Sequence, residues 1–327
     1  MIALVTGGAG FIGSHMVELL LKKNFEVRVI DNFTGGREEN LSNFQSKDLK
    51  VEKIDIRNLK SNANIFKDVD YAFHFAGIGD IVPSIENPNE YAEVNTMGTI
   101  KVLEACRNFG VKKIVYAASS SCYGLAKTPT SENHTIDTKY PYALSKFLGE
   151  QCCFHWEKVY GFKCNSIRIF NAYGTRSRTS GAYGAVFGVF LKQKLSNKPI
   201  TIVGDGEQMR DFIYASDVAN AFFLAADTNI SNSVFNVGGG NPQKINYLAK
   251  LLECKEIEYL PKRPGEPDIT FADIGKIKGE LGWMPVITFE EGVKKVLKDI
   301  NYWKNAPLWD KESINEATKS WFKFMDN

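Results

Sequence analysis

The sequence predicts an α/β protein built on a parallel, doubly wound sheet, with a smaller second domain interleaved toward the C-terminus. Over the first 170 residues, short apolar runs rich in β-branched residues alternate with amphipathic segments. After Phe170 this alternation breaks into polar loops and more mixed segments. Strands that alternate with helices form right-handed parallel crossovers, because each helix must pack back onto the sheet.

The expected strands of the main sheet are short buried runs with turn residues nearby. They cover Ile2–Thr6, Glu26–Ile30, Val51–Asp55, Tyr71–Phe75, Lys113–Ala118 and Cys164–Phe170. The expected helices between them cover His15–Lys23, Tyr91–Asn108 and Tyr142–Tyr160.

The C-terminal half predicts the second domain. A polar, glycine-rich loop over 172–184 precedes an apolar helix near 185–195 and a short strand at Ile200–Val203. Val218–Asp227 is typical of a helix, and Val234–Val237 of a strand that returns to the main sheet. We expect one domain to comprise residues 1–172 plus about 211–240. The other would comprise about 173–210 plus 241–327.

Composition excludes several classes of protein. With 40 basic and 38 acidic residues among 327, the net charge of +2 does not favour nucleic acid or an acidic membrane as a partner. No apolar run approaches the length of a membrane span, and the N-terminus lacks the features of a signal peptide. The six cysteines show no CxxC spacing, and nothing resembles a metal site. We therefore expect a cytoplasmic protein with reduced cysteines and no metal.

A dinucleotide-binding loop is expected between the first strand and the first helix. Gly7, Gly10 and Gly13 let the backbone approach a pyrophosphate, which the N–H groups of the helix N-terminus, including Phe11 and Ile12, then bind. Asp31 lies 18 residues past Gly13, at the end of the second strand, where a carboxylate binds the adenosine ribose diol. Because that carboxylate repels a 2′-phosphate, NAD is favoured over NADP, although Arg37 lies nearby. The fold class is therefore Rossmann-type.

Further cofactor contacts are expected at the carboxyl ends of later strands, where ligands bind in open α/β sheets. Asp55 follows the third strand, and either accepts a hydrogen bond from adenine or acts as a solvated acid or helix cap. Phe75, Ala76 and Gly77 follow the fourth strand. Asn32, Gly36 and Ile56 belong to the same set of predicted cofactor contacts.

A catalytic pair is expected in YPYALSK. Tyr142 and Lys146 are spaced i, i+4, so both side chains lie on one helical face. We expect the ammonium to lower the pKa of the phenol from about 10, making the phenolate a usable general base. Ser119, Ser120 and Ser121 follow the fifth strand, where a hydroxyl can bind the sugar oxygen that Tyr142 deprotonates.

Taken together, the motifs resemble the extended short-chain dehydrogenase/reductase family, in its nucleotide-sugar epimerase and dehydratase branch. The resemblance runs nearly end to end. It rests on TGGAGFIGSH, VIDNFTGG, HFAG, NTMGT, SSSCYG, YPYALSK, RIFNAYG, GDGEQMRDFIYASDVA, FNVGGG and RPGEPDITFADIGKIKGELGW.

The resemblance implies roles for particular residues. Ser119 would be the catalytic Ser/Thr with Ser121 supporting it, and Asn95 and Lys146 would hold the cofactor side. The implied substrate ligands are Ser119, Tyr142, Asn171, Val186, Arg210, Arg263, Glu266 and Thr270. Among them, an arginine suits bidentate contact with a diphosphate. Residues 1–172 plus about 211–240 would bind NAD, and the remainder the nucleotide sugar.

The implied reaction is 4-epimerisation of a nucleotide sugar, most simply a UDP-hexose or UDP-N-acetylhexosamine. Dehydratases of this branch carry an Asp-Glu pair where this chain has Ser120 and Ser121, and decarboxylases a Glu at Ser121. Both reactions are therefore disfavoured, while a UDP-uronate epimerase stays open. A non-catalytic NAD-binding regulator is a further alternative, although such proteins usually lose the Tyr or Lys.

Three expectations concern substrate size, assembly and the tail. Thr270 leaves room for an N-acetyl group, and 178–184 is similar to the loop of UDP-N-acetylhexosamine epimerases. Family members usually form homodimers through two helices, here about 92–108 and 142–160. Trp303, Trp309 and Trp321 predict that the C-terminal tail docks on the body of the protein.

Overall fold

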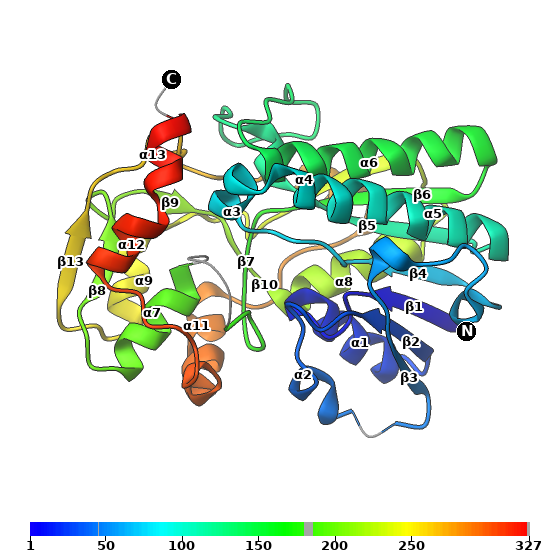
Figure 1. Ribbon diagram of the computed structural model, residues 1–327, viewed down its shortest axis with the longest axis horizontal. Helices are drawn as coiled ribbons and strands as arrows, with labels where there is room; N and C mark the ends of the chain where they lie inside the picture. Colours follow the sequence, from blue (N-terminus) through cyan, green and yellow to red (C-terminus); the bar gives the residue numbers. More distant parts are fainter. Residues whose placement is uncertain (45, 180–185, 326–327) are drawn as a thin grey trace.

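The computed structural model describes residues 1–44, 46–179 and 186–325, and its centre is a parallel sheet (Figure 1). The strand order is β11-β6-β5-β4-β1-β2-β3, and every neighbouring pair in it is parallel. The strands are β1 (Ile2–Thr6), β2 (Glu26–Asp31), β3 (Leu49–Lys53), β4 (Tyr71–His74), β5 (Lys113–Ser119), β6 (Lys163–Ile169) and β11 (Ser233–Val237). The predicted doubly wound α/β fold is confirmed. The order reverses between β1 and β4, which is where such sheets bind ligands.

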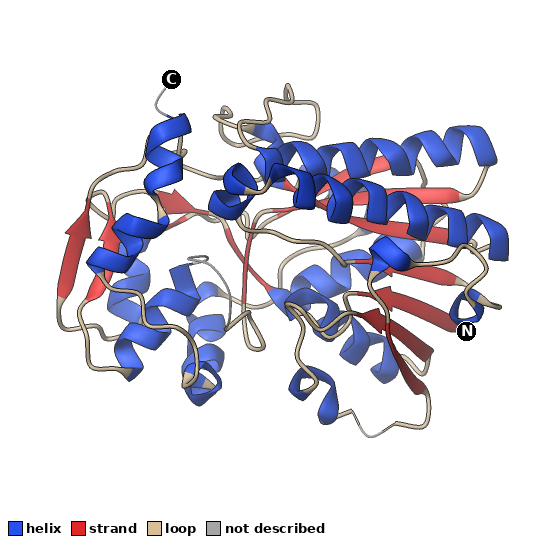
Figure 2. Ribbon diagram, viewed as in Figure 1, coloured by secondary structure: helices blue, strands red, loops and turns tan. Residues whose placement is uncertain are grey.

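Helices cover both faces of this sheet (Figures 1 and 2). On one face, α1 (Phe11–Lys22) and α8 (Ala215–Ala226) share a core that includes the buried Val29 and Phe222. On the other face, α5 (Gly98–Phe109) and α6 (Pro141–Tyr160) enclose a second core around Tyr116. The central strands β1, β4 and β5 are therefore buried from both sides, which explains why their sequences are mainly apolar, whereas the edge strand β3 (LKVEK) is largely exposed.

Several boundaries differ from the sequence prediction. Strand β3 lies two residues earlier than expected, because Leu49–Lys53 pairs with Val27–Asp31 of β2. Helix α1 begins at Phe11 rather than His15, and α8 at Ala215 rather than Val218. The helix expected over 91–108 is divided: α4 (Pro88–Tyr91) leads into a π-helical segment over Ala92–Met97 and then α5.

The C-terminal half supplies most of a smaller, separate core. Its helices are α7 (Val186–Leu195), α9 (Ile245–Leu251) and α11 (Phe289–Lys298), whereas α10 (Gly275–Leu281) packs Ile277 into the core shared by α1 and α8. Its short strands are β7 (Asn171–Tyr173), β8 (Ile200–Val203), β9 (Met209–Arg210), β10 (Phe212–Tyr214), β12 (Gln243–Lys244) and β13 (Ile257–Leu260). Tyr173, Phe187, Phe212 and Phe289 pack their rings together in this core, apart from the two cores of the sheet. This separation supports, as a proposal, the two-domain division expected from the sequence.

The C-terminal tail docks on the protein, as predicted. After α11 it forms a short 3₁₀ turn (Ile300–Trp303), α12 (Lys311–Ala317) and α13 (Lys319–Met325). Trp303 and Trp321 are buried, and Trp309 is partly buried against the smaller core. The remaining short helices are α2 (Glu39–Ser42) and α3 (Ile81–Glu86).

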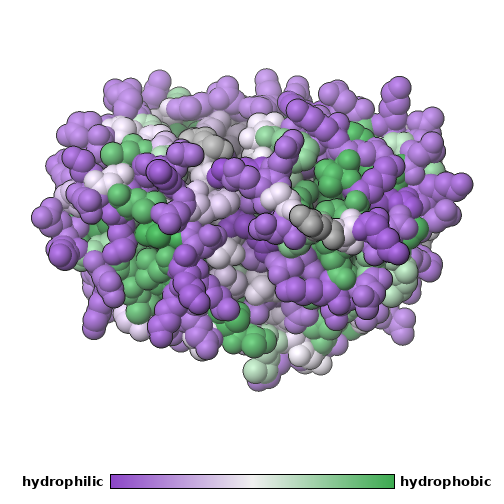
Figure 3. Space-filling model, turned by 90° about the horizontal axis from the view of Figure 1, so that it is seen from below, coloured by the Kyte–Doolittle hydropathy of each residue, from purple (hydrophilic) through white to green (hydrophobic). Residues whose placement is uncertain are grey.

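The surface is mainly polar. Figure 3 shows one face, largely hydrophilic, with hydrophobic residues gathered in separated clusters. Among the described residues, none of the helices has the length and apolar character needed to cross a membrane.

Candidate functional site

The glycine loop joins β1 to α1 in a conformation that demands small residues. Gly7 has a φ of +67°, and a Cβ placed there would lie 2.7 Å from the amide nitrogen of Ala76. A Cβ on Gly13 would lie 2.1 Å from the carbonyl oxygen of Gly7. Helix α1 starts after Gly10, which offers no side-chain cap, so the N–H groups of Phe11 and Ile12 point out of an open N-terminus. The loop therefore fits a pyrophosphate.

Asp31 ends β2 directly beside this loop. Its carboxylate is buried and accepts hydrogen bonds from the backbone N–H groups of Ala9 (3.0 Å) and Phe33 (2.8 Å). Burial raises the pKa of Asp31, although these N–H groups oppose the rise. A carboxylate has about four acceptor positions, so capacity for a ribose diol remains. Gly36 packs over both oxygens, since a Cβ on it would lie 2.9 Å from each.

Arg37 does not point toward Asp31. Its guanidinium forms an ion pair with Glu39 (2.6 Å), donates to the Thr179 hydroxyl (2.7 Å) and lies 4.8 Å from the Tyr302 ring centroid. These contacts turn the cation away from the ribose position. They remove the reason for considering NADP.

Asp55 acts as a helix cap, the second of its two expected roles. It accepts a hydrogen bond from the Arg57 amide (2.9 Å), forms an ion pair with the Arg57 guanidinium (2.7 Å) and accepts from the Asn32 amide group (3.0 Å). The Arg57 hydrogen bonds hold the pKa of Asp55 well below its usual range. Ile56 follows it and is buried in the core under α5. A contact from Asp55 to adenine stays a prediction.

Asn95 lies in the π-helical segment and is completely buried. Its side chain accepts from the Ile78 amide (2.9 Å) and donates to the Ile78 carbonyl (3.0 Å) and the Ser145 hydroxyl (3.0 Å). It therefore ties the loop after β4, which carries Gly77, to α6. Phe75 in the same loop packs on Phe222, with ring centroids 4.3 Å apart.

Below this loop runs a buried hydrogen-bond chain centred on His74. The Ala76 amide donates to the Thr6 hydroxyl (3.2 Å), which lies 2.6 Å from His74 Nδ1. His74 Nε2 lies 2.9 Å from the Thr99 hydroxyl, which donates its proton to the Asn95 carbonyl (2.6 Å). Thr99 has only one proton, so Nε2 of His74 must be the protonated nitrogen, and Nδ1 accepts from Thr6. The ring is therefore neutral and fully hydrogen-bonded.

The hydrogen-bond network around His74 predicts a contribution to stability that depends on pH. Burial lowers the pKa of His74 to about 3 from 6.5, so between these values the unfolded chain binds a proton that the folded chain does not. The stabilisation is present above pH 6.5 and is lost as the pH falls, at about 1.4 kcal/mol per pH unit. The free energy of unfolding can be measured by urea denaturation at pH 6 and at pH 5. Its change per pH unit should be smaller by about this amount in His74→Gln than in the wild type. Replacing the exposed His155 by Gln is the matched control. Equal slopes in His74→Gln and wild type would refute the prediction.

The predicted catalytic hydroxyls meet at the end of β5. Ser119 Oγ donates to Ser121 Oγ (2.9 Å) and accepts from the Ser121 amide (3.2 Å). A hydrogen bond between the Ser119 hydroxyl and Tyr142 favours the phenolate. The structure thus brings Ser119, Ser121 and Tyr142 together, as the sequence predicted.

The effect expected of Lys146 on the phenol is not found in the cofactor-free chain. Burial raises the pKa of Tyr142, and the Asp80 carboxylate raises it further. The Lys146 ammonium instead lies over the Tyr116 ring, 4.5 Å from its centroid, and 3.5 Å from where a Gly77 Cβ would stand. Burial lowers the pKa of Lys146 to about 8. The i, i+4 spacing of Tyr142 and Lys146 on α6 was predicted correctly, but the Lys146 side chain turns toward the loop after β4, which carries Gly77.

Helix α6, which carries both residues, is fixed to the sheet by a buried ion pair. Arg168 of β6 donates to Glu150 of α6 at 2.6 Å, and their side chains are 5% and 1% exposed. Ser166 of the same strand also donates to Glu150 (2.8 Å). Losing one partner of such a pair would leave a buried charge uncompensated. The pair therefore holds the catalytic helix in one position.

The predicted diphosphate ligands lie in and around β9 and β7, outside the main sheet. Arg210 forms an ion pair with Glu266 (2.7 Å), and Arg263 lies 3.9 Å from the second oxygen of Glu266. The Thr270 hydroxyl donates to the Asn171 side-chain oxygen (2.7 Å). Two largely buried guanidinium groups beside a single carboxylate leave a positive charge here, which fits a diphosphate.

Two expectations fall at the edge of the described residues. Val186 is the first residue of α7 and packs partly buried against the smaller core. Of the 178–184 loop, residues 180–184 lie outside the described residues. Across the described ranges 1–44, 46–179 and 186–325, there is no cluster of three or more His, Cys, Asp or Glu able to hold a metal. All six cysteines are free thiols.

Sequence reasoning missed two neighbours of Tyr142. Tyr140 stacks on it, with ring centroids 6.4 Å apart and planes 5° apart, and hydrogen-bonds the Ser121 hydroxyl. Gly79 lies beside it, since a Cβ there would be 4.0 Å from the Tyr142 hydroxyl. The YPY triplet was the available signal for Tyr140, whereas nothing local marks Gly79.

A glycine loop with an acid on β2, and a Ser–Tyr–Lys group at the end of β5, define an NAD-dependent short-chain dehydrogenase-type protein. Residues 3–238 match the model of the NAD dependent epimerase/dehydratase family, and the chain belongs to this family. It is 37% identical over 312 residues to the putative UDP-glucose 4-epimerase of Methanocaldococcus jannaschii, covering 92% of this chain and 98% of that protein. It is 35% identical over 332 residues to the UDP-glucuronate 4-epimerase of Thermodesulfobacterium geofontis, covering 97% and 98% respectively.

A solved structure is also similar over nearly its whole length. It is the UDP-N-acetylglucosamine 4-epimerase from Methanobrevibacter ruminantium M1 in complex with UDP-N-acetylmuramic acid. The TM-score is 0.85 and the identity 33%, covering 91% of this chain and 98% of that one. These comparisons confirm the Rossmann-type fold and the NAD-dependent epimerase/dehydratase family that the motifs predicted.

Proposed function

We propose that this protein is a nucleotide-sugar 4-epimerase acting on a UDP-hexose or UDP-N-acetylhexosamine. The observation that carries the proposal is the hydrogen bond between the Ser119 hydroxyl, at the end of β5, and Tyr142 of α6. The similarity to a putative UDP-glucose 4-epimerase and to a structure named UDP-N-acetylglucosamine 4-epimerase supports this substrate class.

The residues that would hold NAD lie in the loops that follow β1, β2 and β4 and in the segments packed against them. The Gly7–Gly13 loop and the α1 N-terminus would bind the pyrophosphate, and Asp31 the adenosine ribose. Lys146 and Asn95 would lie on the nicotinamide side, next to Gly77. Bound there, NAD would supply hydride-transfer chemistry at sugar C4.

The side chains of this chain would supply the proton chemistry. Ser119 donates a hydrogen bond to the sugar 4-oxygen while Tyr142 Oη takes its proton, and Tyr142 returns that proton when the alcohol reforms. Burial raises the pKa of Tyr142, and a positive charge bound beside the phenol would lower it. Arg210, Arg263 and Asn171 hold the diphosphate while the sugar turns.

Dehydration and decarboxylation fit this site poorly. Ser120 and Ser121 stand where those reactions need carboxyl groups, and a serine hydroxyl is too weak an acid near neutral pH. In addition, the hydroxyls of Ser121 and Ser119 are hydrogen-bonded to each other (2.9 Å). A UDP-uronate is the second candidate substrate for epimerisation, favoured by the relative named UDP-glucuronate 4-epimerase.

The test is to incubate the purified protein separately with UDP-glucose, UDP-N-acetylglucosamine and UDP-glucuronate, without added NAD, and to identify products by NMR. We expect a 4-epimer from at least one of them, with NAD retained by the protein. A 4-keto-6-deoxy sugar or a pentose would overturn the proposed reaction. If none of the three substrates gave a product, even with added NAD, a substrate with another nucleotide or the non-catalytic alternative would be favoured.

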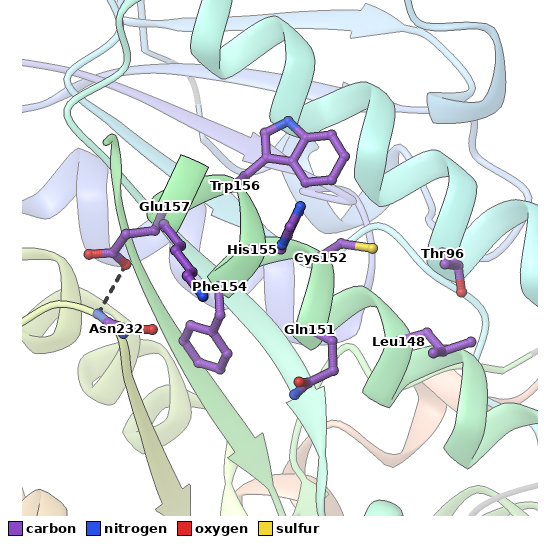
Figure 4. A pocket seen from close by; sticks show the side chains of 10 residues that line it. Thr96, Leu148, Gln151, Cys152, Phe154, His155, Trp156, Glu157 and Asn232 are labelled. Atoms are coloured by element: carbon purple, nitrogen blue, oxygen red, sulfur yellow. Dashed lines mark hydrogen bonds between the residues drawn. The ribbon is translucent and has the colours of Figure 1, made fainter. Parts of the chain in front are cut away.

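We also propose that the protein is a cytoplasmic homodimer that uses the outer face of α6. The inner face of this helix carries Tyr142 and Lys146, yet Leu144 and Leu148 on its outer face are 45% and 41% exposed. A pocket opens on the same side between Leu148, Cys152 and Trp156 (Figure 4). An amphipathic helix needs only one apolar stripe, so a second one suggests a partner. The free thiols suit a reducing compartment.

Placing a charge on this face should separate the subunits. We expect Leu148→Arg to convert the dimer to a monomer in sedimentation at micromolar concentration, because an interface core excludes unpaired charge. Replacing Val286, which is 72% exposed and lies outside α6, by Arg is the control for an added surface charge. A wild-type protein that is already monomeric would refute the dimer.

A further inference from the structure

The C-terminal helix α13 lies between the two parts of the protein (Figure 1). On one side the Ser320 hydroxyl donates to Glu86 of α3 (2.7 Å). Helix α3 follows the loop after β4, which carries Gly77. On the other side the helix meets the loop over 261–268, which contains the predicted nucleotide ligands Arg263 and Glu266. Phe322 and Phe324 are exposed by 37% and 53%, whereas Trp321 is 4% exposed. Trp321 is therefore the residue of α13 whose ring is buried in this junction.

The indole of Trp321 holds the nucleotide loop in two ways. Its N–H donates to the Pro264 carbonyl at 2.7 Å. The Arg263 guanidinium lies over its ring, 5.7 Å from the centroid. A buried indole N–H needs a partner, and a guanidinium is attracted to the face of an indole ring. Both contacts fix the backbone and the side chain next to Glu266.

The same indole also contacts the catalytic tyrosines. Its ring centroid lies 6.1 Å from that of Tyr140, which stacks on Tyr142 and hydrogen-bonds Ser121. Trp321 is thus a common contact of the loop that carries Arg263 and of the group that carries Tyr142.

The loop has little structure of its own to hold it there. Residues 261–268 form no strand or helix, and Gly265 adopts a φ of +69°. A loop that is ordered before the ligand arrives loses less entropy on binding than one that must be ordered by the ligand. A contact that orders it therefore contributes to affinity without touching the ligand.

We propose that Trp321 is a positioning residue that orders the 263–266 loop for the nucleoside diphosphate and fixes its distance from Tyr142. This rests on the proposed function, because it takes Arg263 and Glu266 as substrate ligands. The tail, which no sequence motif explained, would thereby be part of the substrate site.

The experiment compares Trp321→Phe and Trp321→Ala with Trp309→Phe, a matched substitution in the same tail but against the smaller core. Calorimetric titration with UDP, dTDP and GDP gives affinity, steady-state kinetics give KM and kcat, and thermal unfolding gives Tm. Trp321→Phe removes the N–H donor and one of the two fused rings but keeps an aromatic face, so we expect UDP affinity to fall about 3- to 10-fold. KM should rise by a larger factor than kcat falls, and Trp309→Phe should bind UDP as the wild type does.

The outcomes separate the two proposals. Wild-type UDP affinity in both Trp321 variants would overturn this inference alone. Equal weakening by Trp309→Phe and Trp321→Phe, in parallel with Tm, would indicate general destabilisation and would also overturn it. A wild-type protein that binds none of the nucleoside diphosphates would instead overturn the proposed function.

Discussion

Replacing Tyr142 by Phe should lower kcat by about 10²- to 10⁴-fold, the usual contribution of a positioned general base. The substitution removes only the hydroxyl, and the ring can still stack on Tyr140. Because neither the glycine loop nor the arginines are touched, the variant should still bind NAD and UDP. The measurement is the epimerisation rate under saturating substrate, with bound NAD quantified after denaturation.

The matched control for this variant is Tyr160→Phe at the end of the same helix, 47% exposed and distant in sequence from the site. It should turn over as the wild type does. Activity of Tyr142→Phe within tenfold of wild type would show that another group takes the proton. Loss of NAD or UDP binding together with activity would show a structural rather than a chemical role.

Replacing Gly13 by Ala should release the cofactor and destabilise the protein. The added methyl would stand 2.1 Å from the Gly7 carbonyl oxygen, which is backbone and cannot turn aside as a side chain would. Overpacking of this kind costs about 1–3 kcal/mol. If the loop shifts to relieve this contact, we expect NAD affinity to fall about 100-fold, which corresponds to about 2.7 kcal/mol of binding free energy. The purified variant should therefore contain little NAD and unfold at a lower temperature.

Gly279→Ala is the control, because a Cβ at this exposed position in α10 has no atom within 4 Å. An alanine there should stabilise the protein slightly, since it restricts the unfolded chain. If Gly13→Ala retained stoichiometric NAD, the close contact between Gly13 and Gly7 would not be required for cofactor binding.

Much of the fold follows from local patterns in the sequence. Strands β1 and β8 have the predicted bounds, and the other main strands differ by two residues or fewer at each end. Apolar runs and glycine positions act over a few residues, and they predict such elements well. The π-helical turn at Asn95 could not be predicted in this way, because its pattern is that of an ordinary helix. The bounds of β3 depended on pairing with β2.

The sequence by itself predicted the dinucleotide loop, the acid on β2, and Ser119, Tyr142 and Lys146, because each belongs to a short motif at a strand end or on one helix. Only the tertiary structure decided the charge state and direction of these groups. It partly buried Tyr142, turned Lys146 toward Gly77, and placed Arg210 against Glu266 and Trp321 against Pro264. The physical reason is that a pKa and an ion pair depend on burial and on neighbours far along the chain. Such neighbours meet only when the chain folds.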